Sequence, residues 1–334
     1  MNLLIEAIDY YLPKNIVTNK DLEVENPEWD LSKVENKTGV KKRCIARKNE
    51  TAFDLSVKAC EKIFKNYDIN SIDGIIYCTQ SPDYIMPSNA FLLHKYFQFK
   101  TGIFAYDFNH ACTGYIYCLS MANAFFKAGM AKKILIVNSD TYSKYINKKD
   151  RSTRALFGDG AAVTIVKASQ SCKGIIDIDL ASSGINYNKF WIPAGGVRSP
   201  KSESTSEEKK DSRGNIFSEN DIQMNGMGVW SFINSVVPPQ IEKILRRNDL
   251  RLQDIEQFIF HQASLMTLES VRRKMQLPKD KVFTNLQDIG NTVSASIPIA
   301  LKDADKLDLI REGSKIVLSG FGVGLSYGAI LMEY

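Results

Sequence analysis

The sequence is poor in histidine, has no closely spaced cysteine pair and contains no long apolar run. Only three of its 334 residues are histidines. Metal sites built on thiolates use closely spaced pairs, and none is present, so we expect no metal site. No apolar run reaches the roughly 18 residues that a membrane-spanning helix needs, so we expect no membrane span. The six cysteines are Cys44, Cys60, Cys78, Cys112, Cys118 and Cys172.

The beginning of the chain and the charge exclude two further classes of protein. The apolar start MNLLIEAIDYYLPKN carries Glu6 and Asp9, so it predicts a first strand and not a secretory signal. With no such signal and no cysteine pairs, a reduced, cytoplasmic protein is expected. The net charge is +5, and no run of Lys and Arg is interleaved with aromatics. Nucleic acid is therefore not an expected partner, whereas an acidic protein or a phosphorylated ligand would suit such a surface.

What the sequence does contain is an alternation of strand-like and helical segments. Residues 73–80, 131–140 and 161–168 are rich in Ile and Val and are bounded by Gly, Asp or Ser, which is typical of strands. Residues 51–67 and 112–128 have apolar side chains at helical spacing or all round. This alternation predicts an α/β fold with buried central sheets.

The second part of the chain repeats the order of the first. Residues 254–264 (DIEQFIFHQAS) resemble 71–81 (SIDGIIYCTQS), and 314–334 resemble the strands that begin at 132–137. A helical segment precedes the last pair of strands each time. We therefore predict two similar halves, a weak internal duplication in which one half can supply a nucleophile and the other its helpers.

We place the two halves at 1–170 and 171–334. The second half contains a polar, highly charged segment at about 199–221, SPKSESTSEEKKDSRGNIFSEND. Its composition is typical of an exposed, flexible insertion. A lid or a loop that docks a partner is the alternative.

Cys112 is the first candidate for chemistry, in DFNHACTGYIYCLSMANAFFKAG at 107–129. It stands at the start of a predicted helix, where the helix dipole and free N–H groups would lower the thiol pKa. We expect Gly114 to keep the approach to the thiol open, His110 to shape the loop, and Cys118 to be a core residue. Local sequence alone leaves open whether Cys112 is a nucleophile or another small apolar residue of the core.

A nucleophile needs partners, and two residues of the second half qualify. His261 follows a strand-like run, at a place that points into the ligand crevice of α/β proteins. Asn291 precedes a helix of small residues; a simple N-cap is the alternative. The glycines of 319–328 lack the strand–helix context of a phosphate loop. We expect them to let the backbone approach the nucleophile closely.

Five motifs in this order resemble the β-ketoacyl-ACP synthase III family. They are ACTGY around Cys112, FGDGAA at 157–162, HQAS at 261–264, GNTVSASIP at 290–298 and GFGVGLSYGA at 320–329. The early YLPKNIVTNKDLE and KTGVKKR are also similar to that family, so the resemblance covers essentially the whole chain. It implies the thiolase fold, with five αβαβα layers built from two pseudo-twofold halves, and usually a homodimer.

The resemblance also implies a Cys-His-Asn site of Cys112, His261 and Asn291. Cys112 would take an acyl group from acyl-CoA. Malonyl on acyl carrier protein would lose CO2, and its enolate would attack the thioester to give β-ketoacyl-ACP. His261 and Asn291 would donate hydrogen bonds to the malonyl thioester oxygen, and the backbone N–H groups of Cys112 and Val323 would form the oxyanion hole. Acyl-CoA is then a substrate, and no cofactor is implied.

The same likeness assigns further positions. Met86 matches a position that lines the partner subunit's acyl pocket, while Trp29 and Arg151 are candidates for contact with CoA. Pocket size would depend on Met86, Phe157 and Trp230. A basic helix face would dock the carrier protein or would simply be solvated; its residues are Arg272, Arg273 and Lys274.

Two positions depart from the family pattern. Val323 stands where glycine is commonest, and Met266 where a basic residue is often found. With the charged segment at 199–221, these departures suggest a specialised member.

Three other functions compete with a condensing enzyme. An acyltransferase on the same fold would pass the acyl group to an acceptor other than malonyl; the intact Asn291 favours condensation. A papain-like protease also orders Cys, His and Asn along the chain, but its flanking CGSCW-type pattern is absent. An inert subunit of the same fold would be expected to have lost one of the three residues, and none is lost.

Overall fold

The computed structural model describes residues 1–171 and 173–334, so Cys172 lies outside the described residues. The larger of its two main sheets has five strands in the order β1-β7-β6-β4-β5. β1 and β6 are antiparallel to β7, and β4 is parallel to both β6 and β5. The strands are β1 (Asn2–Tyr11), β4 (Gly74–Cys78), β5 (Phe104–Phe108), β6 (Lys133–Asp140) and β7 (Gly160–Ser169).

The second main sheet has four strands in the order β13-β14-β15-β8, all of them after residue 170. β13 is parallel to β14, and the other pairs are antiparallel. The strands are β8 (Gly174–Ser182), β13 (Gln257–Phe260), β14 (Lys315–Gly322) and β15 (Ser326–Glu333). Three two-stranded pairs complete the sheets: β2 (Ile16–Thr18) with β3 (Lys42–Cys44), β9 (Phe190–Trp191) with β12 (Gln223–Met224), and β10 (Lys209–Lys210) with β11 (Ile216–Phe217).

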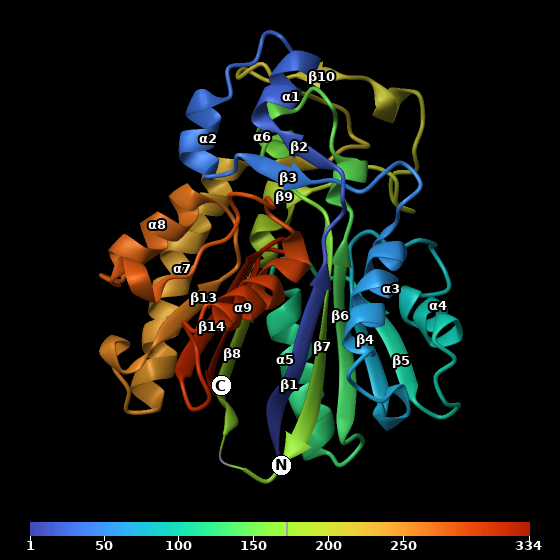
Figure 1. The fold of residues 1–334 in the computed structure, drawn as a ribbon. Coiled ribbons are helices and arrows are strands. Elements are labelled where there is room, and N and C mark those ends of the chain that lie inside the picture. Colours follow the sequence, from blue (N-terminus) through green and yellow to red (C-terminus); the bar gives the residue numbers. More distant parts are fainter. Residues whose placement is uncertain (172) are drawn as a thin grey trace.

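Helices form three layers around the two main sheets (Figure 1). One pair packs on the outer face of the first sheet, one pair lies between the sheets, and one pair covers the second sheet. In that order the pairs are α3 (Ala52–Ile63) with α4 (Asn89–Tyr96), α5 (Gly114–Lys127) with α9 (Ser296–Lys306), and α7 (Gly226–Arg247) with α8 (Leu265–Lys274). The predicted five-layered αβαβα arrangement is confirmed.

The short elements gather mostly at the ends of the layers. Helices α1 (Asn19–Glu25), α2 (Ser32–Thr38) and α6 (Arg151–Arg154) lie at the top of the view in Figure 1. The 3-10 turns are η1 (Ile69–Ser71), η2 (Tyr142–Tyr145), η3 (Gly184–Lys189), η4 (Ser204–Ser206), η5 (Leu252–Asp254), η6 (Lys279–Lys281) and η7 (Val293–Ala295).

Local sequence explains the elements that hold the site. α3 begins at a capping box in which the Thr51 hydroxyl accepts from the Asp54 N–H while the Asp54 carboxylate accepts from the Thr51 N–H. α5 is rich in apolar side chains because most of its residues are buried between the two sheets, while a stripe at Tyr117, Ser120, Met121 and Ala124 is half-buried or exposed. The strand and helix segments expected at 51–67, 73–80, 112–128, 131–140 and 161–168 are all present, with ends shifted by a few residues.

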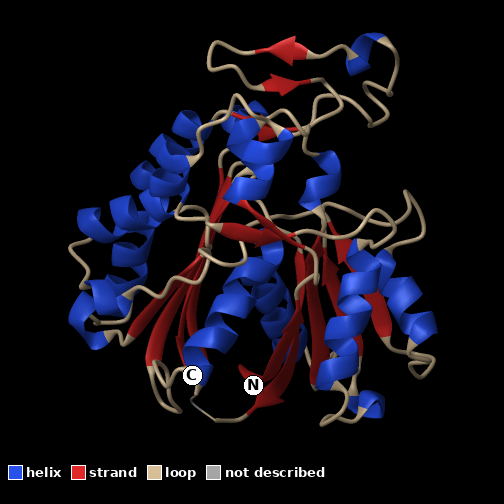
Figure 2. Ribbon diagram, turned by 45° about the horizontal axis from the view of Figure 1, so that its top comes forward, coloured by secondary structure: helices blue, strands red, loops and turns tan. Residues whose placement is uncertain are grey.

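The charged segment 199–221 differs from the expectation. It is largely exposed, as predicted, but it is ordered into η4 and the β10–β11 hairpin, which stands above the body of the molecule in Figure 2. Among the helices of the described residues, none is long and apolar enough to cross a membrane. The five described cysteines are buried and unpaired.

Candidate active site

Cys112 lies in the turn between β5 and α5, where it is 3% exposed. The turn is closed by a hydrogen bond from the Gly114 N–H to the Ala111 carbonyl, 2.7 Å. β14 passes directly against it. A Cβ on Gly320 would lie 2.8 Å from the Cys112 carbonyl oxygen, and one on Gly322 would lie 2.9 Å from its Sγ. The expectation that these glycines allow close backbone approach to the thiol is confirmed.

Gly114 has a different purpose from the one expected. A Cβ there would lie 2.3 Å from the Cys78 Sγ and 3.5 Å from the Cβ of Ser294. The glycine therefore lets the first turn of α5 pack on the end of β4, inside the protein. It does not keep the approach to Cys112 open.

The expected lowering of the Cys112 pKa is also wrong for this closed site. Burial raises the pKa of the thiol, and the nearby Asp140 carboxylate raises it further. The backbone N–H groups of Cys112 and Val323 oppose this by hydrogen bonding to the sulfur. These are the two N–H groups expected to form an oxyanion hole, and they lie beside the thiol.

Asp140 does not line the cavity but acts on the pKa of Cys112, and sequence reasoning missed it. It ends β6 and is fully buried. Its carboxylate accepts hydrogen bonds from the Gln80 N–H at 2.8 Å, the Ser294 N–H at 3.3 Å, the Ser294 hydroxyl and the Thr79 hydroxyl. Burial nevertheless dominates and raises its pKa to about 7. Its position at the end of a central strand was a usable signal, the same one that singled out His261.

His261 directly follows β13, and its N–H donates to the Ser319 carbonyl of β14 at 2.8 Å. Its Nδ1 lies 2.6 Å from the hydroxyl of Ser296, the first residue of α9. Burial lowers the pKa of His261 to about 3, so the imidazole is neutral at ordinary pH. Ser296 belongs to the GNTVSASIP motif. The small side chains of that motif did not by themselves indicate a contact between Ser296 and His261.

Asn291 precedes η7, and its side chain has a fixed orientation. The Oδ1 atom accepts the Val293 N–H at 2.9 Å. This leaves Nδ2 facing His261 Nε2 at 3.4 Å and the Ala263 carbonyl at 3.3 Å. The backbone of Asn291 forms an isolated parallel β-bridge with Phe157 of the first half. Asn291 therefore presents amide hydrogens, and not its oxygen, toward the imidazole.

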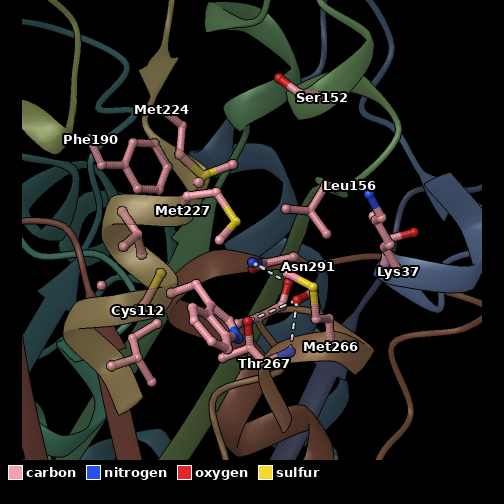
Figure 3. A pocket seen from close by; sticks show the side chains of 18 of the residues that line it. Lys37, Cys112, Ser152, Leu156, Phe190, Met224, Met227, Met266, Thr267 and Asn291 are labelled. Atoms are coloured by element: carbon pink, nitrogen blue, oxygen red, sulfur yellow. Dashed lines mark hydrogen bonds between the residues drawn. The ribbon is translucent and has the colours of Figure 1, made fainter. Parts of the chain in front are cut away.

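Cys112, His261 and Asn291 all line one cavity of about 240 Å³. Figure 3 shows Cys112 on one side of this cavity, Met227 and Asn291 within it, and Lys37 and Ser152 on the other side. Phe157 and Trp230 line the cavity, as expected. Its charged lining residues are both cations, Lys37 and Arg213, and sequence reasoning had assigned neither.

Other expected contacts are placed elsewhere. Trp29 is 7% exposed and packs with Leu22 and Leu31 outside the lining of the cavity, so it offers no free face for stacking. Arg151 starts α6, next to the lining residue Ser152, and its Nη2 donates to the Arg213 carbonyl at 3.4 Å. Met86 is 79% exposed and does not line the cavity of its own chain.

The basic face of α8 is partly neutralised. Arg272 makes a bidentate pair with Glu269 and donates to the Leu277 carbonyl. Lys274 donates to the Asn234 carbonyl at 2.7 Å. Arg273 lies 3.6 Å from Glu269 and remains 76% exposed. Within the described part of the chain, no group of three or more His, Cys, Asp or Glu side chains could hold a metal ion.

Comparison with known proteins gives a consistent result over the whole chain. The family described as "3-Oxoacyl-[acyl-carrier-protein (ACP)] synthase III" matches residues 106–184, and its C-terminal description matches 245–334. A beta-ketoacyl-[acyl-carrier-protein] synthase III of Natranaerobius thermophilus is 36% identical, covering 100% of this chain and 99% of the relative. The Fusobacterium nucleatum protein of the same name is 33% identical, covering 99% and 98%.

Solved structures agree. A 2.1 Å crystal structure of a 3-oxoacyl-(acyl-carrier-protein) synthase III superposes with a TM-score of 0.97 at 34% identity, covering 100% of both chains. The synthase III of Thermus thermophilus gives a TM-score of 0.87 at 31% identity, covering 99% of this chain and 98% of the other. The chain therefore belongs to the 3-oxoacyl-[acyl-carrier-protein] synthase III family.

Proposed function

We propose that this protein catalyses a decarboxylative Claisen condensation. An acyl group moves from acyl-CoA to the Cys112 sulfur, and malonyl-ACP then loses CO2 and forms a carbon–carbon bond to that acyl group. The products are β-ketoacyl-ACP, CoA and CO2. The observation that carries the proposal is that a buried thiol, a neutral imidazole and an oriented amide line one small cavity, drawn from both halves of the fold.

The first step requires the Cys112 proton to leave. The raised pKa of the thiol means that little thiolate is present beforehand, so a base within the cavity must accept the proton. His261 is neutral and so has a free lone pair for this proton. Its lowered pKa makes it a weak base in the closed cavity, and the proposal is that attraction between the thiolate and the imidazolium, once formed, raises that pKa. The thiolate attacks the acyl carbonyl, the N–H groups of Cys112 and Val323 stabilise the oxyanion, and the CoA thiolate leaves with the proton from His261.

The second step needs hydrogen-bond donors and no strong base, because CO2 loss itself generates the carbanion. Asn291 Nδ2 and His261 Nε2 are proposed to donate to the malonyl thioester oxygen as negative charge develops there. This requires His261 to carry its hydrogen on Nε2, whereas the first step requires Nε2 to accept. A hydroxyl can donate or accept, so Ser296 is compatible with both tautomers at Nδ1.

No cofactor takes part in these steps. The acceptor is the point on which the alternative differs: an acyltransferase of the same fold would pass the Cys112 acyl group to something other than malonyl. The fixed Asn291 amide favours condensation, since a simple transfer needs no clamp for an enolate. Measuring CO2 release from malonyl-ACP by the acylated protein separates the two. If acyl-Cys112 forms but malonyl-ACP is not decarboxylated, the result would contradict condensation and favour an acyltransferase.

A homodimer in the cytoplasm completes the proposal. The unpaired described cysteines support a reducing compartment. Strongly exposed apolar side chains at Ile85, Met86, Ile185 and Val197 support a self-association surface. Light scattering after size exclusion should give twice the chain mass of 37.6 kDa, and Met86→Glu should lower it toward one chain. A monomeric wild type would contradict this part alone.

A further inference from the structure

The β10–β11 hairpin brings a cation from the charged segment to the reaction cavity. Its turn carries Arg213, which lines the same cavity as Cys112. Most of the segment is exposed, and its composition predicted a flexible insertion, with a lid or a loop that docks a partner as the alternative. The hairpin therefore forms part of the cavity wall. Two sets of contacts hold it in place.

The first set fixes the turn itself. Asp211 Oδ1 accepts the N–H groups of Arg213 at 2.9 Å and Asn215 at 2.8 Å, and its Oδ2 accepts from the Asn215 side-chain amide at 2.9 Å. Gly214 has φ +84°, which a side chain would strain. With both Asp211 oxygens occupied in this way, the backbone of the turn is fixed at Arg213.

The second set joins the hairpin to the body of the molecule. Lys149 pairs with Glu208 at 2.7 Å, and its carbonyl accepts the Ile216 N–H at 3.3 Å. Arg151 Nη2 donates to the Arg213 carbonyl at 3.4 Å. Each exposed contact is weak alone, but together they attach the hairpin next to α6, whose residue Ser152 also lines the cavity.

The cavity has no negative charge to balance Arg213. Its lining contains two cations, Lys37 and Arg213, and no Asp or Glu. Among the described residues, neither the Lys37 amine nor the Arg213 guanidinium makes an ion pair within 4 Å or a side-chain hydrogen bond. Asp211 is near enough for the charge of Arg213 to lower its pKa, but both of its oxygens are bonded within the turn. Two unpaired cations at an apolar cavity suit a phosphorylated ligand, because guanidinium and phosphate match in charge and geometry.

We propose that the hairpin is a phosphate-recognition element, in which Arg213 together with Lys37 binds a phosphate of the pantetheine-bearing substrate whose thioester reaches Cys112. This rests on the proposed function, since it assumes that such a thioester enters the cavity. Both CoA and the prosthetic arm of the carrier protein carry a phosphate on pantetheine. The shared chemistry is therefore a pantetheine phosphate ester. Arg213 would then contact the acyl-CoA substrate in this chain, a role for which Trp29, buried outside the cavity lining, is not available.

The test is Arg213→Ala, with Lys210→Ala as a control that removes the same charge from the same hairpin outside the cavity lining. Acylation of Cys112 is followed by mass spectrometry with acetyl-CoA and with S-acetyl-pantetheine, which lacks the phosphate. R213A should raise KM for acetyl-CoA about tenfold or more, with kcat nearly unchanged and the loss shrinking at high salt. S-acetyl-pantetheine should be used equally well by wild type and variant, K210A should resemble wild type, and Arg213→Lys should recover part of the loss.

Equal KM values of R213A and wild type for acetyl-CoA would overturn the proposal. An equal loss with S-acetyl-pantetheine would also overturn it, since that is the mark of a merely structural hairpin. Kinetics with malonyl-ACP identify the source: a raised KM for both substrates places the contact at the shared pantetheine phosphate, and a raised KM for acetyl-CoA alone places it at the nucleotide phosphates. Calorimetry of free CoA and of pantetheine binding to wild type and to R213A tests phosphate recognition without acylation. If wild type is never acylated, that failure would refute only the proposed function.

Discussion

Four strands of the first main sheet have counterparts in the second, yet corresponding positions hold different chemistry. β1, β4, β6 and β7 of the first sheet have counterparts in β8, β13, β14 and β15. The fifth strand, β5, pairs in parallel with β4; in the second half its place is taken by a single parallel bridge between Phe258 and Val282. The second sheet therefore has one strand fewer at this edge.

Catalytic chemistry differs at the two equivalent turns. Cys112 stands between β5 and α5, and Asn291 stands between the Val282 bridge and α9. His261 directly follows β13, and its counterpart directly after β4 is Thr79. Both halves therefore contribute to one cavity, Cys112 from the first and His261 and Asn291 from the second, which fits the proposed division into a nucleophile and its hydrogen-bond partners.

The electrostatic environment differs in the same way. The first half buries an acid, Asp140, and burial raises its pKa to about 7. The second half buries a base, His261, and burial lowers its pKa to about 3. Both shifts keep charge out of the centre, because a desolvated group favours its neutral form.

The largest effect is expected from removing the nucleophile. Cys112→Ala should abolish acylation by acyl-CoA and lower the condensation rate by about 10⁴-fold or more, as for other enzymes that lose a covalent nucleophile. Mass spectrometry after incubation with acyl-CoA measures this directly. Cys118→Ala, a change six residues on inside α5, should keep the acyl adduct. An adduct that persists in Cys112→Ala would remove Cys112 from the mechanism.

The second-half residues should separate the two steps. Asn291→Ala removes a donor to the developing enolate and should slow condensation about 10²–10³-fold while leaving the acylation rate nearly unchanged. His261→Ala should slow both steps, because the imidazole is proposed to act in each. Single-turnover acylation and CO2 release, measured separately, check this. Equal losses of acylation in the two variants would contradict the proposed division of roles.

Much of this arrangement could be predicted from the sequence, and the failures have physical reasons. Strand and helix patterns depend on local sequence, so the two halves could be predicted from it. The same holds for the turns that carry Cys112, His261 and Asn291. The pKa of Cys112 was predicted in the wrong direction because the helix-start argument ignored burial by β14, which is distant in sequence. The hairpin could not be found from periodicity, since each of its strands has only two residues.

The buried acid of the first half should make stability fall as pH rises. A folded pKa near 7, above the unfolded value of about 4, means that the folded protein holds the proton more tightly. The stabilising contribution is complete below about pH 4 and is lost as pH rises through 7. The free energy of unfolding of wild type minus that of Asp140→Asn should therefore fall by about 3 kcal/mol between pH 5 and 8. Urea denaturation at several pH values measures it, and a flat difference would show that Asp140 is ionised throughout.

The buried base of the second half should act with the opposite sign. His261 has a folded pKa of about 3, below the unfolded value of about 6.5, so its contribution is complete above 6.5 and is lost as pH falls toward 3. Wild type minus His261→Gln should lose about 3 kcal/mol between pH 7 and 4 by the same denaturation assay. The acylation rate should likewise show no step near pH 6.5 from this residue. A step there that disappears in His261→Gln would mean that the imidazole titrates normally.

The smallest effect concerns the joint between the halves. The Thr113 hydroxyl, at the start of α5, lies 2.7 Å from the Ser326 hydroxyl of β15, and both are buried. Thr113→Val and Ser326→Ala should each cost about 1 kcal/mol, with a coupling of about 0.5–1.5 kcal/mol in a double-mutant cycle. Thr164→Val is the control, because Thr164 donates to the Tyr115 hydroxyl within the first half. If the halves unfold as one unit, all these variants should shift a single urea transition. A control that shifts only one of two transitions would mean that the halves are joined more loosely than their shared active site implies.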